Sequence, residues 1–438
     1  MSASSISVAI IGAGPAGFYA ADALIRKNVE CEIDIIDYLP TPYGLIRAGV
    51  APDHQTTKKI SRSFEKTALN EKCRFFGNIK VGKDISVSKL NEFYDVIILA
   101  VGANSDRPLG IPGEDKKGII GSATFVSWYN AHPDFVDLKP DLDTKNVVIV
   151  GNGNVAIDVA RVLVKTRKEM VSSDLPDYAS EAIENSKISD VFMIGRRGPV
   201  EAKFTNVELR EMGELENAVS LVDLKIIPEK IEGNWSDRDI RLKEKNLETL
   251  RQFTKNTNKS APKRVHFEFW SKPTKILGNS SVEGIQMEKT VLKDGKVIGT
   301  GEFYEIECGL IIPAIGYRSL PIEALPFNYE EDVVLNNNGR VSDGIYAVGW
   351  IKRGPSGVIS TNRPDGVLVA DHIIEDFSKG GLKKGRSSFE DYLKEQNITF
   401  INFDNWKKIE NAEVSAATPP TPRKKLYRID KMLEVGMG

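Results

Sequence analysis

Two glycine-rich turns are the parts of this sequence whose residue types and spacing point most directly to chemistry. The first contains Gly12, Gly14 and Gly17 after a short apolar run, and an acid, Asp37, follows about twenty residues later. The first glycine allows the tight bend, the second lets a pyrophosphate reach the backbone, and the third lets a helix pack closely on the strand. The helix N-terminus supplies N–H donors, and the acid accepts a ribose hydroxyl. The pattern predicts a bound dinucleotide; the alternative is a turn that holds no ligand.

The second turn contains Gly151, Gly153 and Ala156, and it differs from the first in the charge at the end of the next apolar run. Alanine in the third place still permits close packing of helix on strand. That run ends at Arg196 and Arg197, where an acid would select an unphosphorylated ribose. Two arginines instead offer paired donors to a 2′-phosphate. The first turn therefore suits FAD and the second suits NADP(H) over NADH; the alternative is an arginine pair that faces solvent.

The segments around both turns share the same order of strand, turn, helix and strand. Predicted strands cover residues 7–11, 31–36, 94–101, 146–150, 191–194 and 309–314, and predicted helices cover 18–26 and 157–165. The arginine pair lies about forty residues after the second turn, against a usual spacing of about twenty, so an insertion is expected over 169–187. This order predicts an α/β protein with two Rossmann-like dinucleotide-binding lobes.

Four further segments have patterns of their own. The polar stretch 225–264 predicts exposed helix and loop, and the alternation over 282–304 predicts an antiparallel meander. Residues 413–425 are rich in proline, alanine and threonine and then basic, which predicts an extended surface segment. A short helix is expected over 430–435.

Composition excludes several other classes of protein. The 438 residues are 41% hydrophobic and 27% charged, which is typical of a globular protein. Lys and Arg total 59 against 61 Asp and Glu, so bulk charge does not favour nucleic acid. The three cysteines and four histidines are scattered, so neither a disulfide framework nor a metal site is expected. No apolar run is long enough for a membrane span and no signal peptide precedes the first strand, which favours an intracellular protein.

Two dinucleotide sites in one chain imply a redox function. Hydride would pass from NADPH to a flavin, and the flavin would pass electrons onward. The spacing of Cys31, Cys73 and Cys308 disfavours both a dithiol acceptor and an iron–sulfur cluster within the chain.

Several longer motifs resemble those of one family. The run from Pro42 to His54, PYGLIRAGVAPDH, resembles the PxGLxRxGVAPDH signature of the adrenodoxin reductase family, and further matches cover 151–161, 194–199, 204–212, 315–319 and 349–359. That family contains mitochondrial NADPH–adrenodoxin reductases and related bacterial ferredoxin–NADP+ reductases. The resemblance implies a disulfide-reductase-like flavoprotein fold. It also implies a ferredoxin–NADP+ reductase, in which NADPH reduces FAD and single electrons pass to a small iron–sulfur ferredoxin.

The resemblance implies roles for particular residues. Flavin contacts are implied for Ala16, Asp37, Leu45, Val81, Trp350, Gly357, Val358 and Ile359. NADP contacts are implied for Asn152, Gly153, Asn154, Val155, Arg196, Arg197, Glu208 and Gly357, and Lys203 is a further candidate for the phosphate. Trp350 stands where the wider disulfide-reductase superfamily carries an aspartate; the alternative role is a buried core tryptophan.

His54 and Glu211 are the titratable pair predicted to act in catalysis. The resemblance links these positions to proton handling near the flavin, and a histidine with a nearby carboxylate suits a proton relay. The alternative is that His54 caps a turn after Asp53 and Glu211 is a carboxylate on a helix surface.

The expected organisation places an FAD domain over 1–104, an NADP domain over 105–314, and the second part of the FAD domain with a C-terminal extension over 315–438. The ferredoxin is expected to be acidic and to dock transiently on basic residues; the candidates are Arg210, Arg241, Lys243, Lys245 and Arg251. Asp37 replaces the glutamate of mitochondrial members, and the run from Ser360 to Asp365 looks like the bacterial branch. With the missing presequence, that run points to a bacterial cytoplasm, and a monomer is also expected.

Three other functions fit parts of the pattern. A flavoprotein that feeds a partner subunit, like the small subunit of glutamate synthase, would carry an N-terminal cysteine cluster, for which residues 1–6 leave no room. A regulatory protein that senses NADP(H) would bind both nucleotides without turnover. A monooxygenase would oxidise NADPH with oxygen and an organic substrate.

Overall fold

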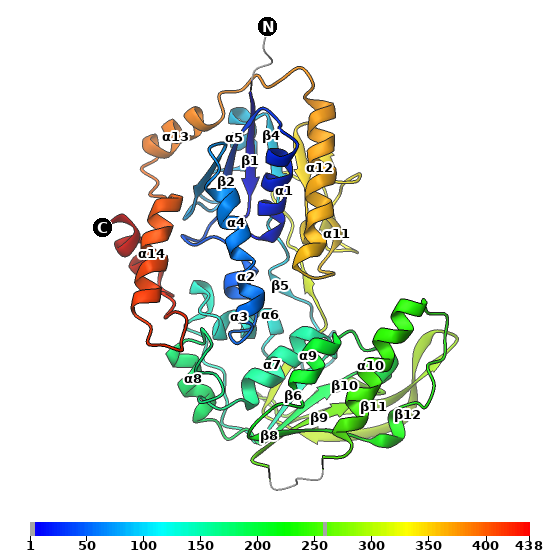
Figure 1. The fold of residues 1–438 in the computed structure, drawn as a ribbon. Coiled ribbons are helices and arrows are strands. Elements are labelled where there is room, and N and C mark those ends of the chain that lie inside the picture. Colours follow the sequence, from blue (N-terminus) through cyan, green and yellow to red (C-terminus); the bar gives the residue numbers. More distant parts are fainter. Residues whose placement is uncertain (1–4, 257–260) are drawn as a thin grey trace. The chain divides into compact units, whose positions relative to one another are not determined.

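The computed structural model describes residues 5–256 and 261–438, which form two compact units. The first unit comprises the chain up to Ser105, Asn130–Val136 and Tyr317–Gly438, and the second comprises Asp106–Tyr129 and Asp137–Gly316. Figure 1 follows the chain through both units. In the described part of the chain, no helix combines the length and the apolar character that crossing a membrane requires.

The segment Asn130–Val136 lies in the first unit, although the sequence placed it in the NADP domain. Tyr38 Oη and His132 Nε2 are 2.9 Å apart, and Lys425 Nζ donates to the carbonyl oxygen of Asn130 at 3.1 Å. Side chains from both ends of the first unit therefore hold this segment. Such long-range contacts leave no local sequence pattern.

A six-stranded sheet in the order β17-β18-β4-β1-β2-β3 forms the centre of the first unit. Its strands are β1 (Ile6–Ile11), β2 (Cys31–Ile36), β3 (Cys73–Phe76), β4 (Val96–Leu99), β17 (Arg340–Ser342) and β18 (Ile345–Ala347). All neighbours are parallel except β17 and β18. Since β1 lies between β2 and β4, chain order reverses on its two sides, and the carboxyl ends of strands at such a reversal are where open α/β sheets bind ligands.

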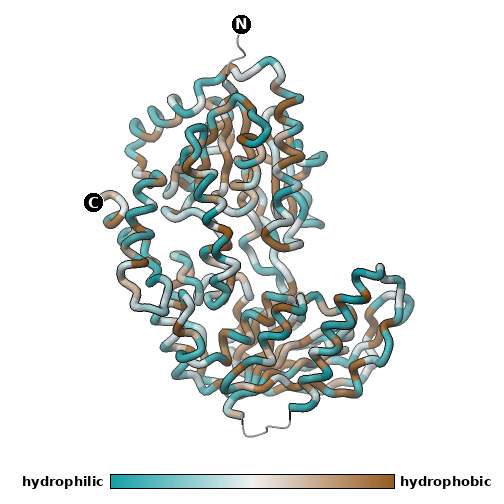
Figure 2. Tube along the Cα trace, in the orientation of Figure 1, coloured by the Kyte–Doolittle hydropathy of each residue, from teal (hydrophilic) through white to brown (hydrophobic). Residues whose placement is uncertain are grey.

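Helices cover both faces of this sheet. The helices of this unit are α1 (Pro15–Arg26), α2 (Leu45–Ala48), α3 (Gln55–Lys58), α4 (Ser61–Ala68), α5 (Val87–Phe93), η1 (Pro133–Phe135), α11 (Trp350–Arg353), η4 (Ile359–Asn362), α12 (Arg363–Asp376), α13 (Arg386–Glu395), α14 (Phe403–Ser415) and α15 (Ile429–Met437). Val8 and Ile10 point into the core under α1, α4 and α12, whereas Ala9 and Ile11 point into the core under α5 and α13. Figure 1 shows α1 between α4 and α12, and Figure 2 shows hydrophobic residues along the strands.

The second unit repeats this plan with a five-stranded parallel sheet in the order β13-β6-β7-β9-β8. Its strands are β6 (Asn146–Val150), β7 (Asp190–Ile194), β8 (Ala218–Val222), β9 (Lys263–Glu268) and β13 (Leu310–Pro313). Its helices are α6 (Ser122–Tyr129), α7 (Asn154–Val164), α8 (Asp177–Glu184), η2 (Pro199–Glu201), α9 (Asn206–Glu211), η3 (Leu224–Ile226) and α10 (Asp237–Phe253). β6 lies between β13 and β7, so the glycine turn after it also opens at a reversal of chain order.

Three smaller sheets complete the structure. An antiparallel sheet joins β10 (Ser271–Leu277), β11 (Gly284–Lys293) and β12 (Lys296–Glu307), and its last two strands cover the predicted meander over 282–304. Two-stranded sheets join β5 (Ser105–Asp106) to β14 (Tyr317–Arg318) and β15 (Phe327–Asn328) to β16 (Val333–Val334).

Two predicted segments differ from the structure. Lys263 and Arg264, expected in exposed helix or loop, begin the inner strand β9, where Arg264 pairs with Asp190 of β7. The predicted surface segment 413–425 begins inside α14. Its last residue, Lys425, is buried, and its Nζ donates to the carbonyl oxygens of Arg47 and Asn130. In both places a charged side chain pairs with a residue far away in the sequence.

Candidate active site

The first glycine turn packs tightly against α1 at Gly12 and Gly17, whereas its backbone at Gly14 is open. Gly12 has φ +111°, and a Cβ on Gly17 would lie 2.1 Å from the Gly12 carbonyl oxygen, so α1 packs directly on the turn. A Cβ on Gly14 would meet no atom within 4 Å. Gly14 precedes the first turn of α1, and no side chain in the described ranges caps that helix. The turn therefore presents open backbone and helix N–H groups to a phosphate.

Asp37 lies beside this turn at the end of β2. Its Oδ2 accepts from the Ala13 N–H at 2.7 Å and its Oδ1 accepts from the Leu39 N–H at 3.0 Å. Burial raises the pKa of Asp37 to about 6, although these backbone donors act to lower it. The carboxylate has remaining lone pairs for a ribose hydroxyl, so turn and acid together fit a dinucleotide with an unphosphorylated ribose.

Two other segments of the first unit border the glycine turn. Tyr43 N–H donates to the Ala13 carbonyl oxygen at 2.8 Å, and a Cβ on Gly44 would lie 3.0 Å from Gly14 Cα. On the other side, a Cβ on Gly349 would lie 2.6 Å from the Cβ of Ala16. Leu45, at the start of α2, therefore shares one border with the turn, and Trp350, at the start of α11, shares the other.

The loop after Trp350 is held by a charged network that sequence reasoning missed. Trp350 Nε1 donates to the Ser356 carbonyl oxygen at 3.2 Å, and Gly357 and Val358 are exposed beyond it. The buried Asp365 accepts from Lys352 Nζ at 2.7 Å and from Arg353 Nε at 2.9 Å. The available signal was the basic pair Lys352 and Arg353 shortly before the acid Asp365 at the start of a helix.

Ile359 and Val81, the remaining residues predicted to contact flavin, lie close to the segments described above. Ile359 opens η4, which leads directly into α12. Val81 follows Ile79, whose N–H donates to the Asp37 carbonyl oxygen at 2.9 Å. The structure thus brings the chain around Val81 close to the predicted ribose acceptor.

The second glycine turn repeats the geometry of the first. A Cβ on Gly151 would lie 2.3 Å from the Ala314 carbonyl oxygen, whereas a Cβ on Gly153 would meet nothing within 4 Å. Asn152 and Asn154 hold the neighbouring chain: Lys203 N–H donates to the Asn152 carbonyl oxygen at 3.1 Å, and Thr205 N–H donates to Asn154 Oδ1 at 2.8 Å. Val155 follows in the first turn of α7.

The arginine pair lies next to this second turn, because a Cβ on Gly195 would lie 2.6 Å from Asn152 Nδ2. Arg196 is exposed, and the buried Nε of Arg197 has no hydrogen-bond partner among the described residues. The antiparallel sheet fixes the backbone at Arg196, since Thr290 Oγ1 on β11 donates to the Arg196 carbonyl oxygen at 2.9 Å. Fixed backbone with guanidinium donors still available fits a 2′-phosphate.

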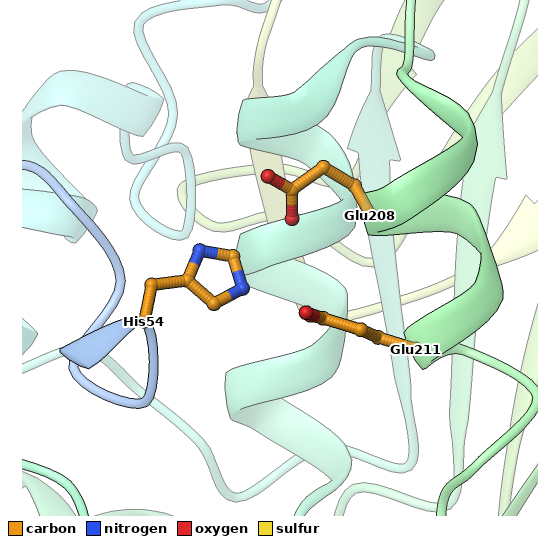
Figure 3. A group of neighbouring side chains, drawn as sticks. All are labelled: His54, Glu208 and Glu211. Atoms are coloured by element: carbon orange, nitrogen blue, oxygen red, sulfur yellow. The ribbon is translucent and has the colours of Figure 1, made fainter. Parts of the chain in front are cut away.

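Glu208 and Glu211 lie one turn apart on α9 and point to the same side of that helix (Figure 3). The guanidinium of Arg161, which is fully buried on α7, reaches both: its Nη1 is 3.0 Å from Glu211 Oε2 and 3.6 Å from Glu208 Oε2. Its Nη2 is 2.9 Å from Asp158 Oδ1. Sequence reasoning did not assign Arg161 a role, although two charges in an otherwise apolar helix were a signal.

His54 lies in the first unit, immediately before α3 (Figure 3). Its backbone N–H donates to the Ala51 carbonyl oxygen at 3.0 Å, and its carbonyl oxygen accepts from the Lys58 N–H at 3.1 Å. His54 occupies the N-cap position of α3, where its imidazole makes no capping hydrogen bond. The backbone of the turn thus fixes its position, and the side chain has no capping role there.

Comparisons with known proteins agree on one family. The model of the pyridine nucleotide-disulphide oxidoreductase family matches residues 6–193. The mitochondrial NADPH:adrenodoxin oxidoreductase of Arabidopsis thaliana is 39% identical over 458 residues, covering 98% of this chain and 95% of that protein. The NADPH-ferredoxin reductase FprA of Mycobacterium leprae is 40% identical over 454 residues, covering 98% of each.

A solved structure agrees with these relatives. FprA of Mycobacterium tuberculosis in complex with NADPH superimposes with a TM-score of 0.94 at 36% identity, covering 99% of this chain and 100% of that one. Both the sequence and the fold match over nearly the whole length. The chain therefore belongs to the adrenodoxin reductase family of oxidoreductases.

Proposed function

We propose that this chain is an NADPH-dependent ferredoxin reductase that binds FAD in its first unit and NADP(H) in its second. One observation carries this proposal: equivalent strand ends have opposite chemistry. The acid Asp37 directly follows β2, whereas Arg196 and Arg197 follow β7 after one glycine. The names of the relatives, NADPH:adrenodoxin oxidoreductase and NADPH-ferredoxin reductase, support the same reaction.

In the first unit, the open backbone at Gly14 and the carboxylate of Asp37 would hold the pyrophosphate and a ribose of FAD. Leu45, Trp350 and the loop from Gly357 to Ile359 would border its other end. When bound, FAD supplies what no side chain can: it accepts a hydride from NADPH and releases electrons one at a time.

In the second unit, Asn152 to Val155 would bind the pyrophosphate of NADP(H), and the two arginines would bind its 2′-phosphate. NADH lacks that phosphate, and it would leave the guanidinium donors unpaired. This asymmetry favours NADPH as the electron donor.

His54 and Glu211 remain the proposed proton-handling groups. A hydride taken in and single electrons given out leave protons to be released, and an imidazole and a carboxylate can each exchange one. Arg161 supports this role, because its buried guanidinium fixes the Glu211 carboxylate on α9. Glu208, on the same guanidinium, is proposed to contact NADP(H).

The burial of the three cysteines supports an electron acceptor outside the chain. All three are buried, and burial raises the pKa of Cys31 to about 11 and that of Cys73 and Cys308 to about 12. A thiolate is the form that exchanges with a disulfide, so these thiols are unsuited to dithiol chemistry. Electrons would therefore leave for a separate partner.

The proposed partner is a small acidic iron–sulfur ferredoxin that docks transiently. Of the candidate cations, Lys243 Nζ donates to the Val200 carbonyl oxygen at 2.6 Å and Arg251 Nη2 donates to the Pro228 carbonyl oxygen at 2.7 Å. Arg210, Arg241 and Lys245 are exposed. These three are better placed to meet an acidic surface. A monomer in the bacterial cytoplasm remains part of the proposal.

The test is NADPH-driven reduction of cytochrome c, with and without an added [2Fe–2S] ferredoxin. We expect strong stimulation by ferredoxin and a large preference for NADPH over NADH. The double variant Arg241→Glu/Lys245→Glu should raise the KM for ferredoxin several-fold at low salt, whereas Lys394→Glu, an exposed lysine on α13, should not. Rapid NADPH oxidation with no ferredoxin stimulation would contradict the proposed partner.

A further inference from the structure

The end of α14 and the chain that comes after it bury an ion pair against the first unit. We call residues 413–426 the C-terminal clamp. The Glu413 side chain is 0% exposed and that of Arg47 is 9% exposed. Arg47 Nη1 lies 2.9 Å from Glu413 Oε2, and Arg47 Nη2 lies 2.5 Å from Glu413 Oε1. This two-point geometry fixes both the position and the plane of the guanidinium.

Other groups of the clamp complete the enclosure of Arg47. The Leu426 N–H donates to Glu413 Oε1 at 2.8 Å, and the Leu426 carbonyl oxygen accepts from Arg47 Nη2 at 3.3 Å. Lys425 Nζ donates to the Arg47 carbonyl oxygen at 3.0 Å. The guanidinium carbon of Arg47 lies 5.4 Å from the centroid of the Trp406 ring. Both the backbone and the side chain of Arg47 are thus held by the C-terminal part of the chain.

Arg47 belongs to the last turn of α2, and α2 begins against the glycine turn. Gly44, with φ +48°, brings its backbone so close that a Cβ would lie 3.0 Å from Gly14 Cα. Tyr43 N–H donates to the Ala13 carbonyl oxygen at 2.8 Å, and the Tyr43 ring meets that of Trp406 at 6.0 Å. A continuous path of packed groups therefore joins Glu413 to the open backbone at Gly14.

We infer that Glu413 is a positioning residue for the FAD site. Through Arg47 it holds α2 against the glycine turn, so the C-terminal clamp forms part of the cofactor-binding structure. This inference rests on the proposed binding of FAD by the first unit.

Glu413→Gln keeps the volume and removes the charge. One accepting oxygen becomes an N–H donor that faces the guanidinium donors, and the buried Arg47 loses its counter-charge. Because Arg47 can regain hydration only by moving outward, α2 should loosen from Gly14. FAD affinity should fall about ten- to a hundredfold, the size of effect found when groups that orient metal ligands are removed.

The experiment measures FAD binding to apo-protein by quenching of flavin fluorescence, together with hydrogen exchange of residues 43–50 in the apo-protein. The control is Asp34→Asn, which removes another carboxylate with 0% side-chain exposure, paired with Arg386 and outside the glycine turn. We expect faster exchange over 43–50 and weaker FAD binding in Glu413→Gln, neither change in Asp34→Asn, and partial recovery in Glu413→Asp.

The outcomes distinguish failure of the positioning role from failure of the proposed function. If Glu413→Gln binds FAD as tightly as the unsubstituted chain, the positioning role is wrong even when its melting temperature falls. If Asp34→Asn weakens FAD binding equally, the effect is general loss of stability and the role is again wrong. If the unsubstituted chain binds no FAD, the proposed function itself fails.

Discussion

The two glycine turns share a backbone plan and differ in the charge of the side chains that follow the next strand. In each unit the turn comes after a strand that lies, in the sheet, between the strand of that sheet that follows it in sequence and a later strand of the chain, and the middle glycine is open. Beside the first turn lies the carboxylate of Asp37; beside the second lie two guanidinium groups. The comparison teaches that the fold fixes where a pyrophosphate sits, whereas one or two side chains at the next strand end decide which nucleotide it belongs to.

The third position of the turn also distinguishes the units. A Cβ on Gly17 would lie 2.1 Å from the Gly12 carbonyl oxygen, whereas the second unit accommodates the fully buried Cβ of Ala156. The first helix therefore approaches its turn more closely than an alanine side chain allows. The two units consequently differ in their tolerance of a methyl group.

The largest expected effect comes from adding a methyl group at Gly17, where the first unit has no room for one. Gly17→Ala forces α1 away from the turn, so we expect the purified protein to lack flavin absorbance near 450 nm. Ala156→Gly removes a methyl group and should cost only about 1 kcal/mol, with NADPH binding retained. Flavin bound stoichiometrically to Gly17→Ala would show that the close approach has no part in cofactor binding.

The next effect tests the charge difference. Arg196→Ala/Arg197→Ala removes the donors to a 2′-phosphate, and charge-assisted hydrogen bonds contribute about 1.5–3 kcal/mol each. We expect kcat/KM for NADPH to fall about a hundredfold or more while kcat/KM for NADH changes little. Steady-state kinetics with ferricyanide as acceptor measure both. Equal losses for the two nucleotides would contradict the assignment.

A third effect arises from the pKa of Asp37, which burial raises to about 6. The unfolded carboxyl titrates near pH 3.9, so in the FAD-free protein this group stabilises the fold below about pH 4, and that contribution is lost as pH rises through about 6. In the proposed ribose contact FAD binds the ionised form of Asp37, so its affinity should fall about tenfold per pH unit below about 6. Fluorescence titrations should show this slope, and Asp37→Asn should abolish it.

The smallest expected effect concerns Asp190 in the second unit, whose pKa is lowered whereas that of Asp37 is raised. Burial acts to raise the pKa of Asp190, but hydrogen bonds from Arg264, at 2.6 Å, and His266, at 2.8 Å, outweigh burial and lower that pKa. Its stabilising contribution is therefore present above about pH 4 and is lost as pH falls. Asp190→Asn should lower the free energy of unfolding by about 1–2 kcal/mol at pH 7, with a smaller difference in acid. A difference independent of pH in urea unfolding would argue against this ion pair.

Local patterns in the sequence predicted both nucleotide units. The predicted strands over 31–36 and 146–150 coincide with β2 and β6, and the two turns lie where expected. These features are encoded within about thirty contiguous residues, since strand, turn and helix each have a local signature. The family comparisons confirm the predicted fold and family.

The parts that could not be predicted depend on contacts between distant residues. Arg161 pairs with Glu211, fifty positions along the chain, and Arg47 pairs with Glu413 across 366 positions. Neither pairing has a periodic pattern, and a polar tail such as 413–425 resembles an exposed segment until its partners are known. The roles of the predicted site residues remain predictions, now with defined positions.

The most direct test of the assignment of nucleotides to units is calorimetric titration with 2′,5′-ADP, which carries the 2′-phosphate but no nicotinamide. We expect one site on the FAD-loaded protein, lost in Arg196→Ala/Arg197→Ala and unchanged in Asp37→Asn supplied with saturating FAD. Binding that survives in the double arginine variant, or that disappears in Asp37→Asn while flavin is still bound, would contradict this assignment.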